Sequence, residues 1–209
     1  TPGQNSNAVA ELVFGMTVMM ARNLYNGTSG TELKGKKLGI HAFGQVGRNV
    51  ARIAKGFGME VFAFDPYCPA SVMEAEGVKP ITDINELYST CQYVSLHIPA
   101  TNETKKSINY ALLKQMPKGA MLINTARKEV INEEELVQIM DERPDFRYVS
   151  DITPDNASVF AEKFTGRYFF TPKKMGAQTA EANINAGIAA AKQSVGFLKE
   201  GIDKFKVNK

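Results

Sequence analysis

Apolar residues along this chain fall into two alternating patterns, short continuous runs and longer segments with helical spacing. The short runs are typical of strands buried on both faces of a parallel sheet, and they occupy residues 37–43, 60–64, 93–98, 120–124, 148–150 and 168–171. Helical spacing predicts helices over 109–116 and 133–141, and a last helix over 179–199 with Ala, Gly and Ile on its packing side. Because parallel strands need crossover helices, the pattern predicts an α/β fold, a doubly wound parallel sheet of the Rossmann type.

The first segment of the chain predicts an amphipathic helix that ends near Leu24. Asn5, Ser6 or Asn7 can cap its N-terminus. Its core-facing stripe consists of Val9, Leu12, Val13, Met16 and Met20. A glycine-rich turn follows, and the first predicted strand then runs directly into Gly44 and another helix. This order of strand, glycine turn and helix is that of a nucleotide-binding unit.

Composition and charge exclude several other classes of protein. With 209 residues, 44% of them hydrophobic, the chain can form one large globular domain. The net charge is only +3 and the charges are interspersed, so no nucleic acid is expected as a partner. Cys68 and Cys91 suggest neither a metal site nor a disulfide framework, which favours a reducing cytoplasm. No apolar run approaches the ~20 residues that span a bilayer, so no membrane partner is expected.

The segment that ends the first predicted strand approximates the dinucleotide-binding motif G-x-G-x-x-G, with Ala42 in the place of the first glycine. Gly44 would let the backbone approach a pyrophosphate, and Gly47 would allow close packing of the helix against the strand. The backbone N–H groups of Gln45 and Val46 would lie at the positive end of the helix dipole. Ala42 fits such a turn if its φ is negative.

Asp65 adds a second cofactor contact at the end of the next predicted strand. It stands close to the ~20 residues beyond the glycine turn at which an acidic side chain hydrogen-bonds the ribose of NAD. A carboxylate there disfavours the extra phosphate of NADP, so NAD is the expected cofactor; the alternative is a solvated aspartate at a strand end. His41 falls inside a strand and is expected to be structural, whereas His97 ends a strand at the edge where ligands bind this fold.

Five sequence blocks resemble the D-isomer-specific 2-hydroxyacid dehydrogenases, and among them the short-type D-3-phosphoglycerate dehydrogenases. In chain order they are residues 34–40 before the glycine turn, 57–61 leading to Asp65-Pro66, His97-Ile98-Pro99 with Thr104, Ile123-Asn124-Thr125-Ala126-Arg127, and Thr171-Pro172 with Gly176-Ala177. In that family the cofactor domain is inserted into a substrate domain. The resemblance therefore implies that 1–187 form the NAD-binding domain, and that 188–209 continue the last helix toward a substrate domain that this chain lacks.

The resemblance also implies a set of site residues. Arg127 would bind the substrate carboxylate and polarise its carbonyl, which suits the planar, permanently charged guanidinium; the alternative is a surface salt bridge. Asp151 would contact the nicotinamide side. The other cofactor contacts would come from His97, Ile98, Pro99, Thr104, Thr125, Ala126, Gly176 and Ala177.

The chain departs from the family pattern where proton transfer is expected. The family has a histidine after Thr-Pro, supported by a glutamate, whereas this chain has Lys173 and Lys174 there and Asn156, preceded by Asp155, in place of the glutamate. We expect a lysine to take over, with its pKa lowered by desolvation beside Arg127 and without a carboxylate partner. Counting back from Gly176 places Lys174 in the position of the histidine, and counting forward from Pro172 places Lys173 there.

Three classes of function are open on this basis. The first is oxidation of 3-phosphoglycerate, or of another D-2-hydroxy acid, by NAD. The second is a non-catalytic NAD-binding module, which the altered proton-transfer residues favour and the retained Arg127 disfavours. The third, a methyltransferase or another nucleotide-binding fold, has no reason to carry the later blocks. We also expect a homodimer that uses the methionine-rich first helix, and NAD binding with almost no turnover by this chain alone.

Overall fold

The computed structural model describes residues 3–203 and contains, within that range, one parallel sheet. Its strand order is β3-β2-β1-β4-β5-β6-β7, and every neighbouring pair is parallel. The strands are β1 (Lys37–His41), β2 (Glu60–Phe64), β3 (Lys79–Pro80), β4 (Tyr93–Leu96), β5 (Met121–Asn124), β6 (Arg147–Ser150) and β7 (Tyr168–Phe170). The doubly wound α/β sheet expected from the sequence is confirmed.

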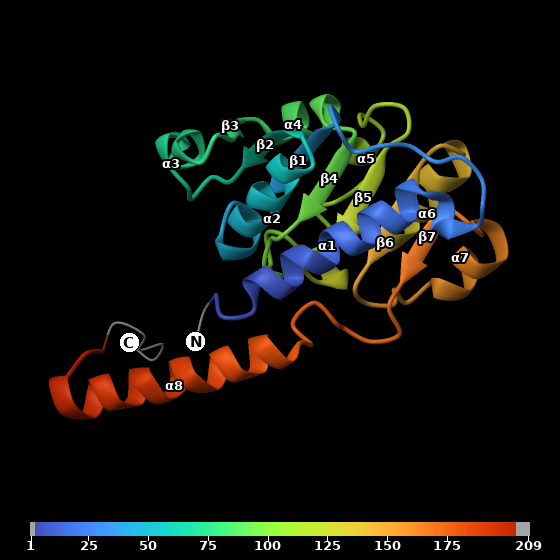
Figure 1. Cartoon of the computed structure of the whole chain (residues 1–209). Helices are drawn as coiled ribbons and strands as arrows, with labels where there is room; N and C mark the ends of the chain where they lie inside the picture. The colour runs from blue at the N-terminus through green and yellow to red at the C-terminus, as the bar shows by residue number, and fades with distance from the viewer. Residues whose placement is uncertain (1–2, 204–209) are drawn as a thin grey trace.

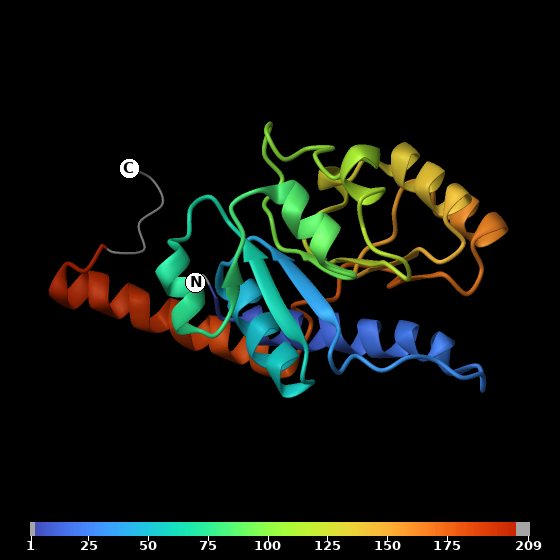
Figure 2. The ribbon, with the colours of Figure 1, turned by 90° about the horizontal axis from the view of Figure 1, so that it is seen from above.

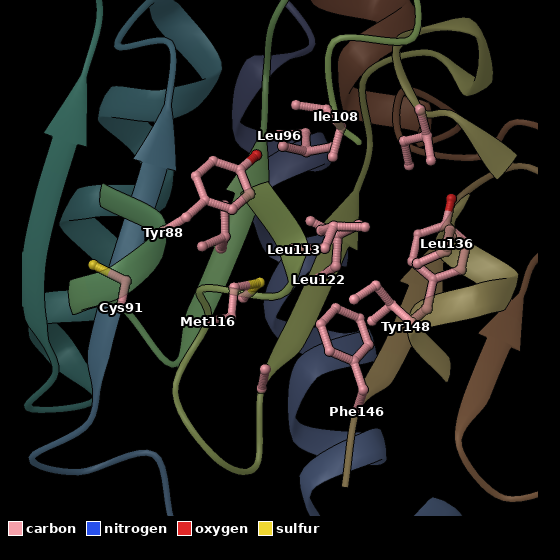
Figure 3. Packing of buried hydrophobic residues seen from close by; sticks show 14 of the residues in the cluster. Tyr88, Cys91, Leu96, Ile108, Leu113, Met116, Leu122, Leu136, Phe146 and Tyr148 are labelled. Atoms are coloured by element: carbon pink, nitrogen blue, oxygen red, sulfur yellow. The ribbon is translucent and has the colours of Figure 1, made fainter. Parts of the chain in front are cut away.

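Helices cover both faces of this sheet, in two layers that are separated clearly in Figure 2. One layer holds α1 (Ser6–Ala21), α2 (Gln45–Gly56) and α3 (Ala70–Ala75). The other holds α4 (Ile84–Thr90), α5 (Tyr110–Leu113), α6 (Glu133–Glu142) and α7 (Ala157–Lys163). Successive strand residues point to opposite faces, so Leu122 packs under the second layer with Tyr148 (Figure 3), while Ile123 packs under α1 and α2.

The direction of winding reverses at β1, which pairs with β2 on one side and with β4 on the other. The chain proceeds outward from β1 to β3 and then returns to β4 for the second half of the sheet. The connections that follow β1 and β4 therefore diverge to opposite faces. In open parallel sheets a ligand binds at such a switch point, beyond the carboxyl ends of the strands.

The first helix is shorter than predicted and starts differently. Asn5 stands at the N-cap but its side chain makes no capping bond, while the Ser6 hydroxyl donates to the carbonyl of Gly3 at 2.5 Å. The α-helix ends at Ala21 instead of Leu24, and a 3₁₀ turn with left-handed backbone, η1 (Asn23–Tyr25), follows. The chain folds back here so closely that a Cβ on Gly30 would lie 2.3 Å from the carbonyl oxygen of Ala21.

Two of the three methionines of α1 are not available for the dimer surface expected from the sequence. Met16 and Met20 are fully buried against the sheet, as is Val13. They belong to the same core as the strands, so they give no support to a homodimer. Leu12 is only partly buried at the rim of this core.

The last helix, α8 (Ala180–Glu200), projects away from the body of the molecule (Figure 1). The expectation that its Ala, Gly and Ile residues form a packing face is wrong for the described residues, because only Ala182 is buried and Ile184 is 60% exposed. The helix passes position 187 without a break, so the domain division predicted there stays a prediction. Residues 1–2 and 204–209, which include the end of the expected return segment, lie outside the described range. Among the described helices, none has the length and hydropathy to cross a membrane.

Candidate active site

A cavity of about 720 Å³ opens at the carboxyl edge of the sheet. It lies beyond the ends of β4, β5 and β6, and is closed by the loop after β7 and the N-terminal part of α1. Most of the predicted site residues line it, namely Val46, His97, Ile98, Pro99, Thr125, Ala126, Arg127, Asp151, Lys174, Gly176 and Ala177. Four further lining residues were not predicted: Asn5, Val9, Ala100 and Gln178. The helical spacing that marks Val9 as a core residue gives no sign that α1 reaches the site.

The glycine turn lies beside this cavity and is built as the motif requires, with one exception. A Cβ on Gly47 would lie 2.5 Å from the carbonyl oxygen of Ala42, so α2 packs directly on the turn. Nothing lies within 4 Å of the Cβ position of Gly44, which leaves space for an approaching ligand. Ala42 has φ +83°, so the condition of a negative φ under which an alanine fits this turn is not met. This left-handed backbone is what the first glycine of the motif normally supplies, and it strains an alanine.

Asp65 holds the glycine turn to the loop that follows β2. Its Oδ2 accepts a hydrogen bond from the N–H of Phe43 at 2.8 Å, and its Oδ1 accepts one from the N–H of Tyr67 at 2.8 Å. The carboxylate therefore stands at the end of β2, next to the turn, as the sequence predicted. It does not line the main cavity, and neither do Gly44, Gly47 or Gln45. A dinucleotide that followed this edge of the sheet would extend from the main cavity past the turn to Asp65.

Lys174 and Asp151 form the most enclosed charged contact of the cavity. The Nζ of Lys174 lies 2.9 Å from Oδ1 and 3.2 Å from Oδ2 of Asp151, whose side chain is 1% exposed. The same ammonium donates to the carbonyl oxygens of Thr125 at 3.1 Å and Ala126 at 2.8 Å. The prediction that the lysine has no carboxylate partner is therefore wrong. The sequence gives no sign of this pair, because the two residues follow different strands: Asp151 comes directly after β6, and Lys174 lies in the loop after β7.

The position of the family's glutamate makes no contact with this lysine. The N–H of Asn156 donates to the carboxylate of Glu133 at 3.2 Å, and its side-chain amide donates to the carbonyl of Glu133 at 3.2 Å. Asp155 pairs instead with Lys128. Burial raises the pKa of the Glu133 carboxyl above its ordinary value. Neither Asp155 nor Asn156 lines the main cavity.

Arg127 extends from the loop after β5 and is exposed at the mouth of the cavity. Its Nη1 donates to the carbonyl of Ala126 at 2.9 Å. The loop is held from below by the fully buried Asn124, whose amide donates to the carbonyl of Arg127 at 3.0 Å and accepts from the N–H of Ala126 at 2.9 Å. Asn124 was not predicted as a positioning residue, although an amide in an otherwise apolar strand is a signal for one.

The two histidines have the places that the sequence assigned to them. Burial lowers the pKa of His41, inside β1, to about 4, and its Nδ1 lies 3.3 Å from the hydroxyl of Tyr88. Burial also lowers the pKa of His97 to about 3, and its Nε2 lies 3.0 Å from Oγ of Ser95. His97 is therefore a neutral residue at the cavity wall, suited to packing and hydrogen bonding but not to carrying charge.

Two other predicted residues turn away from the cavity. Thr104 donates to the carbonyl of Pro99 at 2.5 Å and accepts from the N–H of Thr101 at 2.8 Å, so its side chain braces its own loop. Lys173 is exposed and does not line the cavity, and its carbonyl accepts a bond from the hydroxyl of Thr171. Of the two candidate lysines, the structure brings only Lys174 to the other site residues.

One buried hydroxyl at the cavity wall has no hydrogen-bond partner among the described residues and can bond to a dinucleotide. The Oγ1 of Thr125 is buried at the cavity wall without a hydrogen-bond partner. Buried polar atoms are normally paired, so this hydroxyl is available to a ligand. Together with the open space at Gly44 and the carboxylate of Asp65, it gives the edge of the sheet the contacts that NAD needs.

The family model described as "D-isomer specific 2-hydroxyacid dehydrogenase, NAD binding domain" matches residues 7–167. The chain belongs to this family. The matched part of the dehydrogenase domain includes the glycine turn, Asp65, Arg127 and Asp151, and it ends before Lys174. The family assignment excludes the methyltransferase reading.

Individual relatives of the dehydrogenase family extend the match over the whole chain. D-3-phosphoglycerate dehydrogenase of Methanocaldococcus jannaschii is 32% identical over 99% of this chain and 42% of the relative, and that of Haemophilus influenzae is 30% identical over 99% and 54%. Hydroxypyruvate reductase of Thermotoga maritima is 31% identical over 90% of this chain and 65% of the relative. The chain thus spans about half the length of curated relatives that it matches.

Among solved structures, the NAD⁺-bound 3-phosphoglycerate dehydrogenase of Entamoeba histolytica is similar to this chain with a TM-score of 0.91. The two sequences are 47% identical, and the match covers 100% of this chain and 67% of that one. This similarity includes the loop with Lys174 and the helix α8, which the family model does not reach.

Proposed function

We propose that this chain is the cofactor-binding part of an NAD-dependent dehydrogenase that oxidises 3-phosphoglycerate to 3-phosphohydroxypyruvate, the first step of serine biosynthesis. One observation carries the proposal: Lys174, Asp151 and Arg127 line the same cavity, at the carboxyl edge of the sheet where ligands bind this fold. Similarity to D-3-phosphoglycerate dehydrogenases along the whole chain supports the choice of substrate.

Each residue has a distinct task in this proposal. Arg127 binds the carboxylate of the substrate in a bidentate manner through its planar guanidinium. The Nζ of Lys174 accepts the hydroxyl proton as the C2–H bond breaks. Thr125 and the backbone beside Gly44 hold the cofactor, and Asp65 binds its ribose. When bound, NAD supplies the hydride acceptor, so that the alcohol is oxidised and NAD is reduced.

Two alternative functions can be distinguished from 3-phosphoglycerate oxidation by experiment. A dehydrogenase for another D-2-hydroxy acid is supported by the similarity to a hydroxypyruvate reductase. A non-catalytic NAD-binding module would explain the absence of the family's histidine and glutamate. Against the module, Arg127 and an alternative proton-transfer group line the same cavity, an arrangement that cofactor binding alone does not require.

The test is NAD reduction by the full-length protein with 3-phosphoglycerate, D-lactate and D-glycerate as separate substrates. We expect the highest kcat/KM for 3-phosphoglycerate. Lys174→Ala should lower kcat by roughly 10²- to 10⁴-fold, the range for loss of general acid–base catalysis, while the Kd for NAD changes little. Lys173→Ala is the matched control and should remain near wild type. NAD binding without turnover of any hydroxy acid would favour the non-catalytic module.

A further inference from the structure

Asp151 is the one fully buried carboxylate at the cavity among the described residues. Its Oδ2 accepts the backbone N–H of Gly176 at 2.9 Å as well as a bond from Lys174. A Cβ on Gly176 would lie 2.7 Å from this oxygen, so the loop after β7 fits closely around the carboxylate. The loop that carries Lys174 is thereby attached to the end of β6.

We propose that Asp151 is the positioning partner of Lys174, a carboxylate that replaces the family's glutamate from a different strand; this assignment rests on the proposed dehydrogenase function. The distances of 2.9 and 3.2 Å from Nζ make this a charge-assisted contact. A carboxylate that is 1% exposed would be strongly destabilising without a cationic partner. The pair is therefore a coupled unit rather than a surface ion pair.

The number of N–H groups on the Nζ of Lys174 indicates how Lys174 and Asp151 would act in proton transfer. The protonated Nζ has three N–H donors, and its partners are Asp151 and the carbonyls of Thr125 and Ala126. The neutral amine has two N–H groups, which can stay on Asp151 and one carbonyl while the lone pair accepts the substrate's hydroxyl proton. The ammonium formed is then neutralised by Asp151.

Within residues 3–203, the other groups that line the cavity offer no negative charge to neutralise the ammonium of Lys174. Arg127 lines the same cavity and its guanidinium opposes a second positive charge. His97 also lines it, but is neutral because burial lowers its pKa. Asp155, the nearest carboxylate in sequence to the family's glutamate position, is occupied by Lys128. Among the described residues lining the cavity, Asp151 alone supplies a compensating negative charge.

The test is competitive acetylation of the full-length protein with acetic anhydride at a series of pH values, with each lysine quantified by mass spectrometry. In Asp151→Asn, Lys174 should be acetylated faster than in the wild type at each pH, because its Nζ loses the carboxylate that lies 2.9 Å away. The acetylation rate of Lys173, on the same loop, should not change and serves as the internal control. An unchanged rate for Lys174 overturns the proposal.

Two further readouts keep the test decisive. If Asp151→Asn does not fold, Lys174→Met is compared with Lys173→Met: the first leaves the buried carboxylate without a cation, so its Tm should be the lower of the two, and equal Tm values overturn the pairing. Where Asp151→Asn folds, the pH profile of kcat/KM for oxidation should differ from that of the wild type, which a merely structural role would not cause. Faster acetylation of Lys174 in the variant, without any turnover in the wild type, would preserve the pair and refute the proposed dehydrogenase function.

Discussion

Replacing Gly47 with alanine would test how tightly α2 packs on the glycine turn. The added Cβ would lie 2.5 Å from the carbonyl oxygen of Ala42 and 3.0 Å from Cγ2 of Ile40. The first of these atoms belongs to the backbone of the turn itself and cannot rotate away. The substitution therefore forces α2 to move relative to β1, and with it the N–H groups that face the cofactor.

The expected loss of stability follows from two opposing contributions. Overpacking costs typically 1–3 kcal/mol, and we take the upper part of that range, about 2–3 kcal/mol, because the clashing atom is backbone. The better helix propensity of alanine returns up to about 1 kcal/mol. The net loss is about 1–3 kcal/mol. For a chain of this size, each kcal/mol lowers Tm by roughly 2–4 °C, so Gly47→Ala should melt about 2–12 °C below the wild type.

Gly44→Ala is the matched control, because it changes the same turn without a clash. Gly44 has φ −78° and ψ −160°, and its Cβ position is open. Its stability should be unchanged or up to about 1 kcal/mol higher, whereas its Kd for NAD should rise at least tenfold, roughly 1.4 kcal/mol. Circular dichroism and calorimetric titration measure the two effects. A wild-type Tm for Gly47→Ala would refute the close packing, and wild-type NAD affinity for Gly44→Ala would refute the pyrophosphate site.

Three other predictions concern the cofactor, pH and assembly. Asp65→Ser should raise the affinity for NADP relative to NAD in calorimetric titration, and an unaltered ratio would place Asp65 away from the ribose. His41 and His97 have folded pKa values of about 4 and about 3, so the unfolded chain binds more protons below pH 6.5. The free energy of unfolding should then fall between pH 6.5 and 4, by up to about 2 kcal/mol per histidine at pH 5; urea titrations measure this, and a flat profile contradicts it. The homodimer expected from the sequence gains no support from the buried Met16 and Met20; sedimentation should show it at tens of micromolar, and only monomer there would end that expectation.

The strands were the most predictable part of the fold, because a buried parallel strand needs a continuous apolar run. The pattern gave β2 with its observed bounds and the other long strands to within a few residues. It missed β3 (Lys79–Pro80), which has two residues and no apolar run, and is held at the sheet edge by pairing with Phe62 and Ala63. It also missed the short helices α3, α4 and α7, whose buried faces consist of only one or two residues each.

The site was predictable where a residue's role depends on local geometry. Strand ends place Asp65 and His97 at the ligand edge, and this follows from the alternation of elements alone. Arg127 was expected there from the resemblance to the dehydrogenase family. The contact between Lys174 and Asp151 depends on the loop after β7 reaching the end of β6, which no spacing in the sequence expresses. The positive φ of Ala42 is likewise not expressed in the sequence, since the turn is imposed by the close packing of α2.

In the proposed dehydrogenase, the altered histidine and the altered glutamate of the family's proton-transfer pair have one physical explanation. Asn156 bonds to Glu133, and Asp155 pairs with Lys128, so the segment that carries the family's glutamate has no carboxylate to offer the cavity. The remaining carboxylate, Asp151, is buried at the end of β6 and needs a cationic partner. The flexible four-carbon stem of lysine lets one amine contact this carboxylate and two carbonyl groups from the neighbouring strand end. In the proposed mechanism, loss of the glutamate and replacement of the histidine by Lys174 are therefore expected together, as the two halves of a relocated acid–base pair.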